Sequence, residues 1–225
     1  MPAFPRIKLI IFDLDGTLVD TAADMADAIN DVLPRDIPPV TLEEARAVMG
    51  AGDDTLANRL SRETSGLDQR EFGKRFAVAY AARLSGHTKL YPGVRETLTK
   101  LSACSKVVLS NRKIALVLPV LERFKLLPYF LDVIGRDSGT GVKPSPDPVL
   151  HVVGRFAVKP DETIIVGDCF NDIDAGRAAG VRTVAVTYGY GVDRSFIDRA
   201  DFVIDRFSLL LQVVARLDCP DPVKP

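Results

Sequence analysis

Short apolar runs alternate along most of the chain with longer segments whose apolar residues recur at helical spacing. Continuous runs of branched apolar residues are typical of strands buried on both faces of a parallel sheet. Such runs predict strands over residues 7–11, 107–110, 131–135, 163–167 and 182–187. The intervening segments predict helices over residues 95–104, up to residue 122, and over residues 147–156 and 172–179, with Pro119 expected either to kink its helix or to start a new one. This alternation predicts an α/β fold with a doubly wound parallel (Rossmann-like) sheet.

Helical patterns alone fill the segment between residues 21 and 86. Thr21-Ala22-Ala23-Asp24 and Thr41-Leu42-Glu43-Glu44 have the composition of capping boxes, and each predicts the start of a helix. A third helix is predicted from Asp68. Its apolar stripe, interpreted as packing rather than as a cofactor site, consists of Phe72, Phe76, Tyr80 and Leu84. We therefore expect an α/β core made of residues 1–20 and 87–225, and an all-helical cap domain over residues 21–86.

Two aspartates follow the first predicted strand, in Phe12-Asp13-Leu14-Asp15-Gly16-Thr17. In an extended backbone, residues i and i+2 project to the same side, so Asp13 and Asp15 are expected to share one space. Two carboxylates so close repel each other unless a cation neutralises them or one holds a proton. A solvated acidic turn would have the same sequence, so the ends of the other strands decide between the two interpretations.

Polar residues also follow the other predicted strands. Ser110 and Asn111 offer a hydroxyl and an amide, together with backbone N–H groups, that can donate to phosphate oxygens. Lys143 lies in the proline-rich stretch Lys143-Pro144-Ser145-Pro146, as either a surface charge or a positioned cation. Asp168 ends a strand in Gly167-Asp168, and Asp172 follows where a helix begins, a position that favours acids in any case.

The carboxyl ends of parallel strands meet at one edge of a sheet, and ligands bind there in open α/β folds. Asp13, Asp15 and Asp168 would then form an oxygen-rich site suited to Mg²⁺. Ser110 and Lys143 would face the same cavity from the phosphate side. The sequence therefore predicts a site in which an aspartate acts on a phosphate group.

Taken in order, Asp13-Leu14-Asp15-Gly16-Thr17, Ser110-Asn111, Lys143-Pro144 and Gly167-Asp168 followed by Asp172 resemble the motifs of the haloacid dehalogenase superfamily of phosphohydrolases. The resemblance extends from residue 7 to about residue 214. It implies a Mg²⁺-dependent phosphomonoester hydrolase with a helical cap inserted after the first motif.

The resemblance also implies a role for each motif residue. Asp13 would be the nucleophile that forms an aspartyl-phosphate, and Asp15 would protonate the leaving oxygen and later activate water. Mg²⁺ would be held by side-chain oxygens of Asp13 and Asp168 and by the backbone carbonyl of Asp15. Lys143 would neutralise charge at the phosphate. The remaining roles are phosphate binding by Ser110 and the N–H of Asn111, and orientation of the metal's waters by Asp172.

Two positions depart from the pattern of relatives. Arg112 stands where a lysine is common, with no purpose readable from the sequence, and Cys169 stands where a serine is common and is interpreted as an inert small side chain. Gly189-Tyr190-Gly191 follows the last predicted strand and is either a border of the cavity or a plain turn.

The predicted cap resembles that of phosphoglycolate phosphatases around Gly50-Ala51-Gly52, where the glycines would let backbone N–H groups approach the substrate and Arg59 would bind its carboxylate. Phosphoglycolate is therefore the first expected substrate. Sugar phosphates, pyrophosphate and nucleotides remain alternatives. A phosphomutase is a further alternative, although residues 21–30 lack the histidine of sugar mutases. The alternative that is not an enzyme is a sensor of phosphate ligands.

Charge and composition restrict the class of partner. The 225 residues contain 29 Lys and Arg and 30 Asp and Glu, a net charge of −1, which argues against nucleic acid or an anionic membrane as the partner. No apolar run approaches the length of a membrane span, and the first residues lack the apolar core of a signal peptide. Three scattered cysteines form no disulfide framework or metal spacing. We expect a cytoplasmic protein whose partner is a small phosphorylated metabolite; the oligomeric state cannot be read from the sequence.

Overall fold

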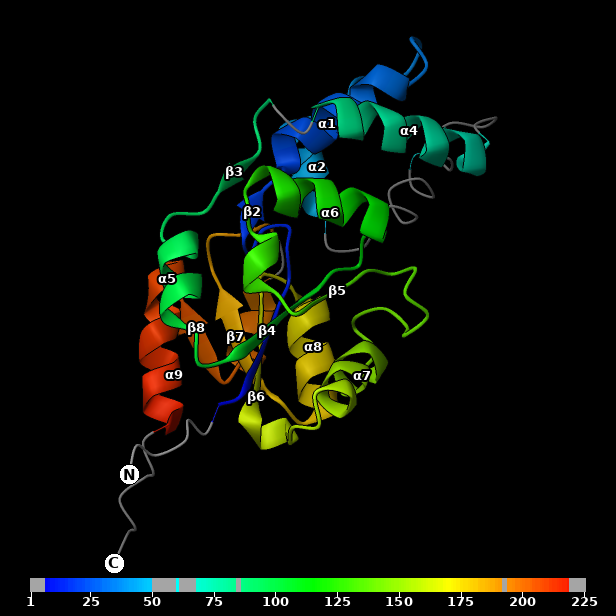
Figure 1. Cartoon of the computed structure of the whole chain (residues 1–225). Helices are drawn as coiled ribbons and strands as arrows, with labels where there is room; N and C mark the ends of the chain where they lie inside the picture. The colour runs from blue at the N-terminus through cyan, green and yellow to red at the C-terminus, as the bar shows by residue number, and fades with distance from the viewer. Residues whose placement is uncertain (1–6, 50–59, 61–67, 84–85, 192–193, 219–225) are drawn as a thin grey trace, which may run out of the picture.

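The computed structural model describes residues 7–49, 60, 68–83, 86–191 and 194–218. A six-stranded sheet forms its centre, with strand order β5-β4-β1-β6-β7-β8 and every neighbouring pair parallel (Figure 1). The strands are β1 (Leu9–Phe12), β4 (Ser105–Leu109), β5 (Asp132–Ile134), β6 (Thr163–Gly167), β7 (Arg182–Val186) and β8 (Phe202–Ile204). β1 is central, with Ile11 opposite both Val107 and Ile165. The prediction of a doubly wound parallel sheet is confirmed.

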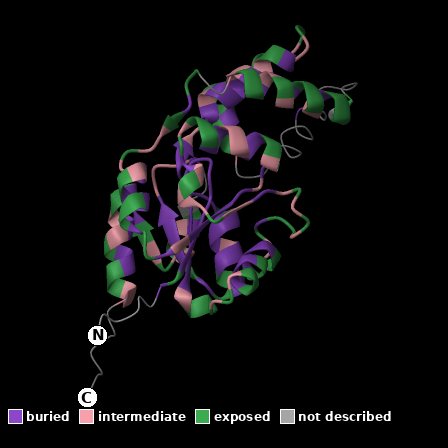
Figure 2. Ribbon diagram, in the orientation of Figure 1, coloured by how far each residue is buried: buried purple, intermediate pink, exposed green. Residues whose placement is uncertain are grey.

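Different helices cover the two faces of the sheet, because successive residues of a strand point to opposite sides. Ile10 and Phe12 belong to a core that contains apolar residues of three helices of the α/β part and of the segment 21–86, whereas Leu9 and Ile11 belong to a core with two other helices. The first three helices are α5 (Val94–Lys100), α6 (Ile114–Arg123) and α9 (Leu210–Asp218); the other two are α7 (Asp147–Arg155) and α8 (Phe170–Ala179). Figure 2 shows the central strands buried and the outer faces of these helices exposed. Helices therefore cover both faces of the sheet, and the sheet fixes the backbone positions of the residues at its edge.

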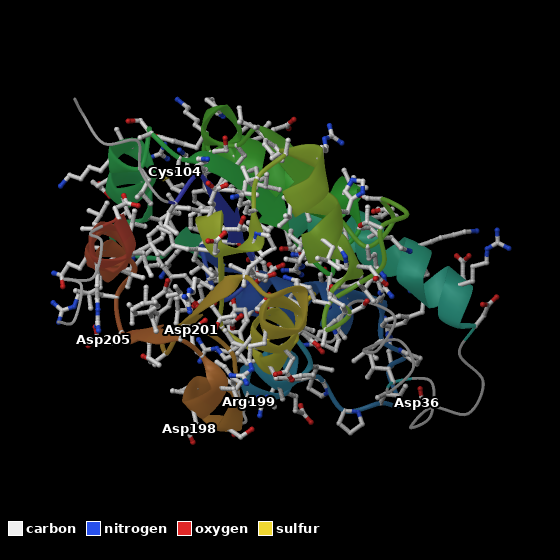
Figure 3. The ribbon with its side chains drawn as sticks, turned by 90° about the horizontal axis from the view of Figure 1, so that it is seen from below. Asp36, Cys104, Asp198, Arg199, Asp201 and Asp205 are labelled. Atoms are coloured by element: carbon white, nitrogen blue, oxygen red, sulfur yellow. The ribbon has the colours of Figure 1, made fainter. Side chains whose placement is uncertain are left out.

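Parts of the core differ from the sequence prediction or were missing from it. α6 continues through Pro119 as one helix, so a new helix does not start there. β8 and α9 lie beyond the last predicted strand. Asp201, labelled in Figure 3, lies directly before β8. It accepts hydrogen bonds from the backbone N–H (2.8 Å) and the hydroxyl (3.0 Å) of Thr183 on β7. This contact anchors the start of a three-residue strand whose own sequence pattern is too short to predict it.

A helical cap lies beyond the carboxyl edge of the sheet (Figure 1). Its described helices are α1 (Ala22–Val32), α2 (Leu42–Val48) and α4 (Gln69–Arg83). A two-stranded antiparallel ribbon, β2 (Val19–Asp20) with β3 (Lys89–Leu90), leads into the cap and out of it. The predicted capping box of α2 is confirmed: the Thr41 hydroxyl accepts from the Glu44 N–H, and the Glu44 carboxylate accepts from the Thr41 N–H. The exact domain limits at residues 20 and 87 stay a prediction.

The capping box predicted at Thr21 is wrong. The Thr21 side chain makes no cap hydrogen bond to α1; its hydroxyl donates to Asp15 Oδ1 at 2.5 Å. Asp24 is buried and accepts hydrogen bonds from the backbone N–H groups of His87 (2.7 Å) and Thr88 (2.9 Å), where the chain leaves the cap. Both polar side chains thus bind segments outside their own helix, which a local sequence pattern does not reveal.

Candidate active site

Asp13 and Asp15 lie where β1 ends, and both are nearly buried. The Asp13 N–H still donates to the Val166 carbonyl of β6 (2.9 Å), so the backbone position of Asp13 is fixed by the sheet. Gly16 then turns the chain with a φ of +83°, and a Cβ there would lie only 2.1 Å from Asp168 Oδ2. A residue with a side chain would therefore be both strained and in collision with Asp168. The acidic ends of β1 and β6 meet in one place.

Lys143 is a positioned cation and not a surface charge, since it is only 3% exposed. Its Nζ donates to Asp13 Oδ1 (2.7 Å), Asp172 Oδ1 (2.6 Å) and the Leu109 carbonyl (2.6 Å). These three bonds use all three protons of the ammonium group. Burial lowers the pKa of Lys143, but the carboxylates of Asp13 and Asp172 more than offset this and hold the pKa above that of an ordinary lysine. Lys143 is therefore charged, and it neutralises part of the acidic cluster.

The backbone of Lys143 is held by Asn111, from the loop after β4. The Asn111 amide donates to the Lys143 carbonyl (2.7 Å), and its side-chain oxygen accepts from the Lys143 N–H (2.9 Å). Ser110 is buried beside it, and its Oγ accepts from the backbone N–H of Arg112 (3.2 Å). The structure thus brings the predicted phosphate-binding loop against the predicted cation.

Asp168 and Asp172 complete the cluster from β6 and the first turn of α8. Asp168 Oδ2 accepts from the backbone N–H of Tyr190 (2.5 Å), and a Cβ on Gly189 would come within 2.3 Å of Asp168. Gly189-Tyr190-Gly191 therefore borders the site, which decides between the two alternatives for this segment. Cys169 donates to Asp172 Oδ2 (3.2 Å); burial, with the nearby acids, raises the pKa of Cys169, which keeps the thiol protonated and unreactive.

Negative charge exceeds positive charge in this cluster: among the described residues, Lys143 is the one cation paired with the buried carboxylates of Asp13 and Asp172, while Asp168 lies close by. Burial, only partly offset by Lys143, raises the pKa of Asp13 to about 7. Burial and the neighbouring charge of Asp13 raise the pKa of Asp168 well above its ordinary value. Buried carboxylates with uncompensated charge are the environment that a divalent cation stabilises.

The donor chemistry fits Mg²⁺, which prefers hard oxygen ligands. Carboxylates of Asp168 and Asp172 lie close enough to hold one ion together with the Cys169 sulfur, but a thiol is a poor ligand for Mg²⁺. Asp13 and Asp168 remain the better side-chain donors: Lys143 and Cys169 occupy both oxygens of Asp172, whereas among the described residues one oxygen of Asp13 and one of Asp168 accept a hydrogen bond. The metal-ligand roles predicted for Asp13, Asp15 and Asp168 stay predictions.

Arg112 and Tyr80 are residues of the site that the sequence analysis did not assign. Arg112 is buried, and its Nη1 donates to Asp15 Oδ1 (2.9 Å) and to the hydroxyl of Tyr80 (3.0 Å). Tyr80 is fully buried on α4 of the cap. The signals were present: an arginine where relatives have lysine, and a hydroxyl on an otherwise apolar stripe. What the sequence does not show is that these two residues meet.

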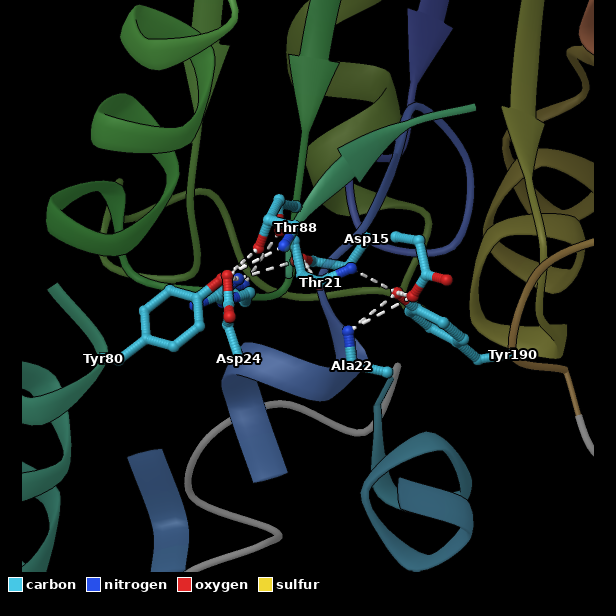
Figure 4. Close-up of polar contacts among 10 residues, drawn as sticks. Asp15, Thr21, Ala22, Asp24, Tyr80, Thr88 and Tyr190 are labelled. Atoms are coloured by element: carbon cyan, nitrogen blue, oxygen red, sulfur yellow. Dashed lines mark hydrogen bonds and ion pairs between the residues drawn. The ribbon is translucent and has the colours of Figure 1, made fainter. Parts of the chain in front are cut away.

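Tyr190 links the site to the cap from the other side (Figure 4). Its hydroxyl accepts from the backbone N–H groups of Thr21 (2.6 Å) and Ala22 (3.1 Å) and lies 2.8 Å from Asp20 Oδ1, to which it donates. Free N–H groups at the start of a helix need acceptors. The acceptors for the start of α1 are the Tyr190 hydroxyl and, for the Ala22 N–H, also Asp20 Oδ1 (3.4 Å), and not the Thr21 side chain.

The predicted substrate-binding residues of the cap, Gly50, Gly52 and Arg59, lie outside the described residues, and their roles stay predictions. Within the described ranges, no helix has the length and apolarity needed to cross a membrane.

Comparison with known families now identifies the class. Residues 10–186 match the family model of haloacid dehalogenase-like hydrolases. The chain belongs to this family and is a phosphatase-type hydrolase, as its motifs predicted.

Its relatives carry a more particular name. The chain is 34% identical over 221 residues to "Phosphoglycolate phosphatase" of Mannheimia succiniciproducens, covering 93% of this chain and 99% of the relative. It is 36% identical over 213 residues to "Phosphoglycolate phosphatase 1" of Pseudomonas aeruginosa, covering 91% and 78%. Among solved structures, one described as a predicted phosphoglycolate phosphatase from Haemophilus somnus superposes with a TM-score of 0.86 at 31% identity, covering 92% of this chain and 98% of that one. The relatives thus agree in name with the group that the cap sequence resembles.

Proposed function

We propose that this protein is a Mg²⁺-dependent phosphomonoester hydrolase that works through an aspartyl-phosphate and takes phosphoglycolate as its substrate. The observation that carries the proposal is the buried Lys143 ammonium held between Asp13 and Asp172, with Asp168 beside them at the carboxyl edge of the sheet. A cation in this position can bind both the nucleophilic carboxylate and the phosphate dianion that this carboxylate attacks. The names of the relatives support phosphoglycolate as the substrate.

Asp13 is the proposed nucleophile. Its Oδ1 is occupied by Lys143, whereas no hydrogen bond to Oδ2 occurs among the described residues. A free carboxylate oxygen attacks the phosphorus atom, a bond forms between them, and the bond from phosphorus to the substrate oxygen breaks. Lys143 reduces the repulsion between the carboxylate and the dianion during this step. When bound, Mg²⁺ supplies the further positive charge that the site and the phosphoryl group require.

Asp15 is the proposed proton donor and acceptor. Its Oδ1 accepts from Thr21 and Arg112, while its Oδ2 is buried and has no hydrogen-bond partner in the part of the chain that the structure describes. An unpartnered buried oxygen is costly unless a ligand or water completes it. We propose that Asp15 Oδ2 faces the leaving group of the substrate. It gives a proton to the departing alkoxide, and then takes one from the water that hydrolyses the aspartyl-phosphate.

The phosphate oxygens are proposed to bind the Ser110 hydroxyl and the Asn111 backbone N–H. The Asn111 side chain already holds the Lys143 backbone from both sides, so the loop that binds phosphate and the loop that carries the cation keep a fixed spacing. Fixed donors cost no reorganisation during the reaction. Asp172 is proposed to orient Lys143 and the metal's waters.

The core is proposed to consist of residues 1–20 and 87–225, and the cap of residues 21–86. In this division the core carries out phosphoryl transfer and the cap selects the rest of the substrate. Gly50, Gly52 and Arg59 are proposed to bind the carboxylate of phosphoglycolate, because N–H donors and a guanidinium suit that group.

A panel of phosphate esters with Mg²⁺ tests the proposal. It should contain phosphoglycolate, sugar phosphates, pyrophosphate, nucleotides and an aryl phosphate. We expect the highest kcat/KM for phosphoglycolate, no activity in chelator, and no phosphate release by a folded Asp13→Asn protein. The exposed Asp205→Asn variant is the matched control and should retain activity. A higher kcat/KM for another ester would overturn the proposal that phosphoglycolate is the substrate. The absence of phosphate release from every ester would overturn the proposal that the protein is a phosphatase.

A further inference from the structure

A polar bridge connects the cap helix α4 with Asp15 of the core. Arg112 forms its middle: Nη1 lies 2.9 Å from Asp15 Oδ1 and 3.0 Å from the Tyr80 hydroxyl. The guanidinium carbon also lies 4.3 Å from the centre of the Tyr80 ring, a cation–π distance. The Arg112 side chain is 6% exposed and Tyr80 is fully buried, so water does not compete for these contacts.

Tyr80 is fixed within the cap. Phe72, Phe76 and Tyr80 form the buried stripe of α4, and the rings of Phe76 and Tyr80 stack with centres 5.8 Å apart. In Figure 4 Tyr80 reaches the site from the side of α4, opposite to Tyr190. The position of the Tyr80 ring and hydroxyl therefore follows the position of the cap.

Asp15 is held through one oxygen. Thr21, at the entrance to the cap, and Arg112 both donate to Oδ1, and two donors on one oxygen fix the direction of the other oxygen, Oδ2. A planar guanidinium orients a carboxylate more strictly than an ammonium group, which binds as a point charge. This is a physical reason for arginine at a position where lysine would keep the charge but lose both the planar geometry and the stacking on Tyr80.

We propose that Arg112 is a positioning residue for Asp15, and that Tyr80 makes this positioning depend on the cap being seated over the core. The inference rests on the proposed role of Asp15 as proton donor. Its consequence is selective: loosening Arg112 leaves Asp13, Lys143 and the phosphate site in place but misdirects the proton donor. Substrates whose leaving oxygen needs a proton should suffer, and substrates with a stable leaving anion should not.

The test compares two leaving groups by kcat/KM, which reports the steps up to departure of the leaving group. The substrates are the best alkyl phosphate of the ester panel and 4-nitrophenyl phosphate. General acids accelerate reactions by about 10²- to 10⁴-fold. We therefore expect Arg112→Gln and Tyr80→Leu to lower kcat/KM for the alkyl ester by roughly 10- to 100-fold. The kcat/KM for the aryl ester should stay almost unchanged. The conservative variants Arg112→Lys and Tyr80→Phe should recover part of the loss. Tyr129→Phe, which removes an exposed hydroxyl that lies 3.1 Å from Thr99 Oγ1, is the matched control.

The outcomes separate this inference from the proposed function. Asp15→Asn must show the selective loss on the alkyl ester; if it does not, the proton-donor role fails, and this inference fails with it. If Asp15→Asn shows the loss but the Arg112 and Tyr80 variants slow both esters equally, the two residues only stabilise the fold and the positioning role is overturned. Thermal unfolding of each variant identifies any that fail to fold. If Tyr80→Leu does not fold, Tyr80→Phe, which keeps the ring but lacks the hydroxyl bonded to Arg112, carries the test with a smaller loss confined to the alkyl ester.

Discussion

Replacing Lys143 with methionine tests the electrostatic account of the site in isolation from catalysis. Methionine has a similar unbranched chain, so Lys143→Met removes the charge and the three hydrogen bonds while leaving little empty space. Removing one partner of a buried ion pair costs about 3–5 kcal/mol, because the other charge stays buried without compensation. Here two carboxylates, Asp13 and Asp172, are left. We expect the free energy of unfolding in chelator at pH 8 to fall by about that amount.

The penalty should also depend on pH in a defined direction. Without Lys143, whose charge lowers it, the folded-state pKa of Asp13 rises further above the value of about 4 expected in the unfolded chain. The folded variant then binds protons that the unfolded chain does not, so its stability falls as pH rises through this range. At pH 5 a carboxyl group holds a proton, and the penalty should be smaller than at pH 8 by roughly 1 kcal/mol or more.

Urea unfolding at both pH values measures the effect, and Lys106→Met is the matched control. Lys106 is buried on β4, but its Nζ donates to the carbonyls of Leu101 (2.7 Å) and Cys104 (2.8 Å) and to no carboxylate among the described residues. Its loss should cost about 1–3 kcal/mol, with no dependence on carboxyl titration. A Lys143→Met penalty below about 1 kcal/mol, or one equal at pH 5 and pH 8, would refute the reasoning.

Three further predictions concern the metal and the substrate. In the chelated protein, Asp13 with a pKa of about 7 and Asp168 with a raised pKa bind protons more tightly when folded, so the free energy of unfolding should decline from pH 4 to pH 7. Urea unfolding with Mg²⁺ should show a smaller decline. An unchanged decline would argue against Mg²⁺ binding at these carboxylates. Asp168→Ala should weaken Mg²⁺ binding in calorimetric titration at least tenfold without lowering the melting temperature; unchanged affinity would remove Asp168 from the ligand set. Arg59→Ala should raise KM for phosphoglycolate and leave an aryl phosphate nearly unaffected, whereas equal small effects on both would exclude recognition by Arg59.

The sequence predicts the elements that carry their own pattern. β1 and β6 are continuous apolar runs, and the strand ends that follow them are predicted to meet because parallel strands share an edge. β8 has only three residues and depends on Asp201 for its position, so no local pattern predicts it.

The residues of the site also divide into those that a local sequence pattern predicts and those that depend on contacts with distant segments. Asp13 and Lys143 stand in motifs whose order along the chain predicts that they come together. Thr21, Tyr80 and Arg112 have functions set by partners from distant segments: a hydroxyl expected to cap its helix binds Asp15, and a residue of an apolar stripe binds a guanidinium. Such contacts depend on how the cap sits on the core, which neither segment specifies alone.

Covalent trapping of the phosphoryl group tests the central claim most directly. Asp15→Asn should form the aspartyl-phosphate from 4-nitrophenyl phosphate, whose leaving group needs little protonation, and should hydrolyse it slowly. After rapid acid quenching, mass spectrometry of peptides should find a phosphoryl group on Asp13, with none in the double variant Asp13→Asn, Asp15→Asn. A phosphoryl group on another residue, or nitrophenol release without any covalent phosphate, would contradict the account.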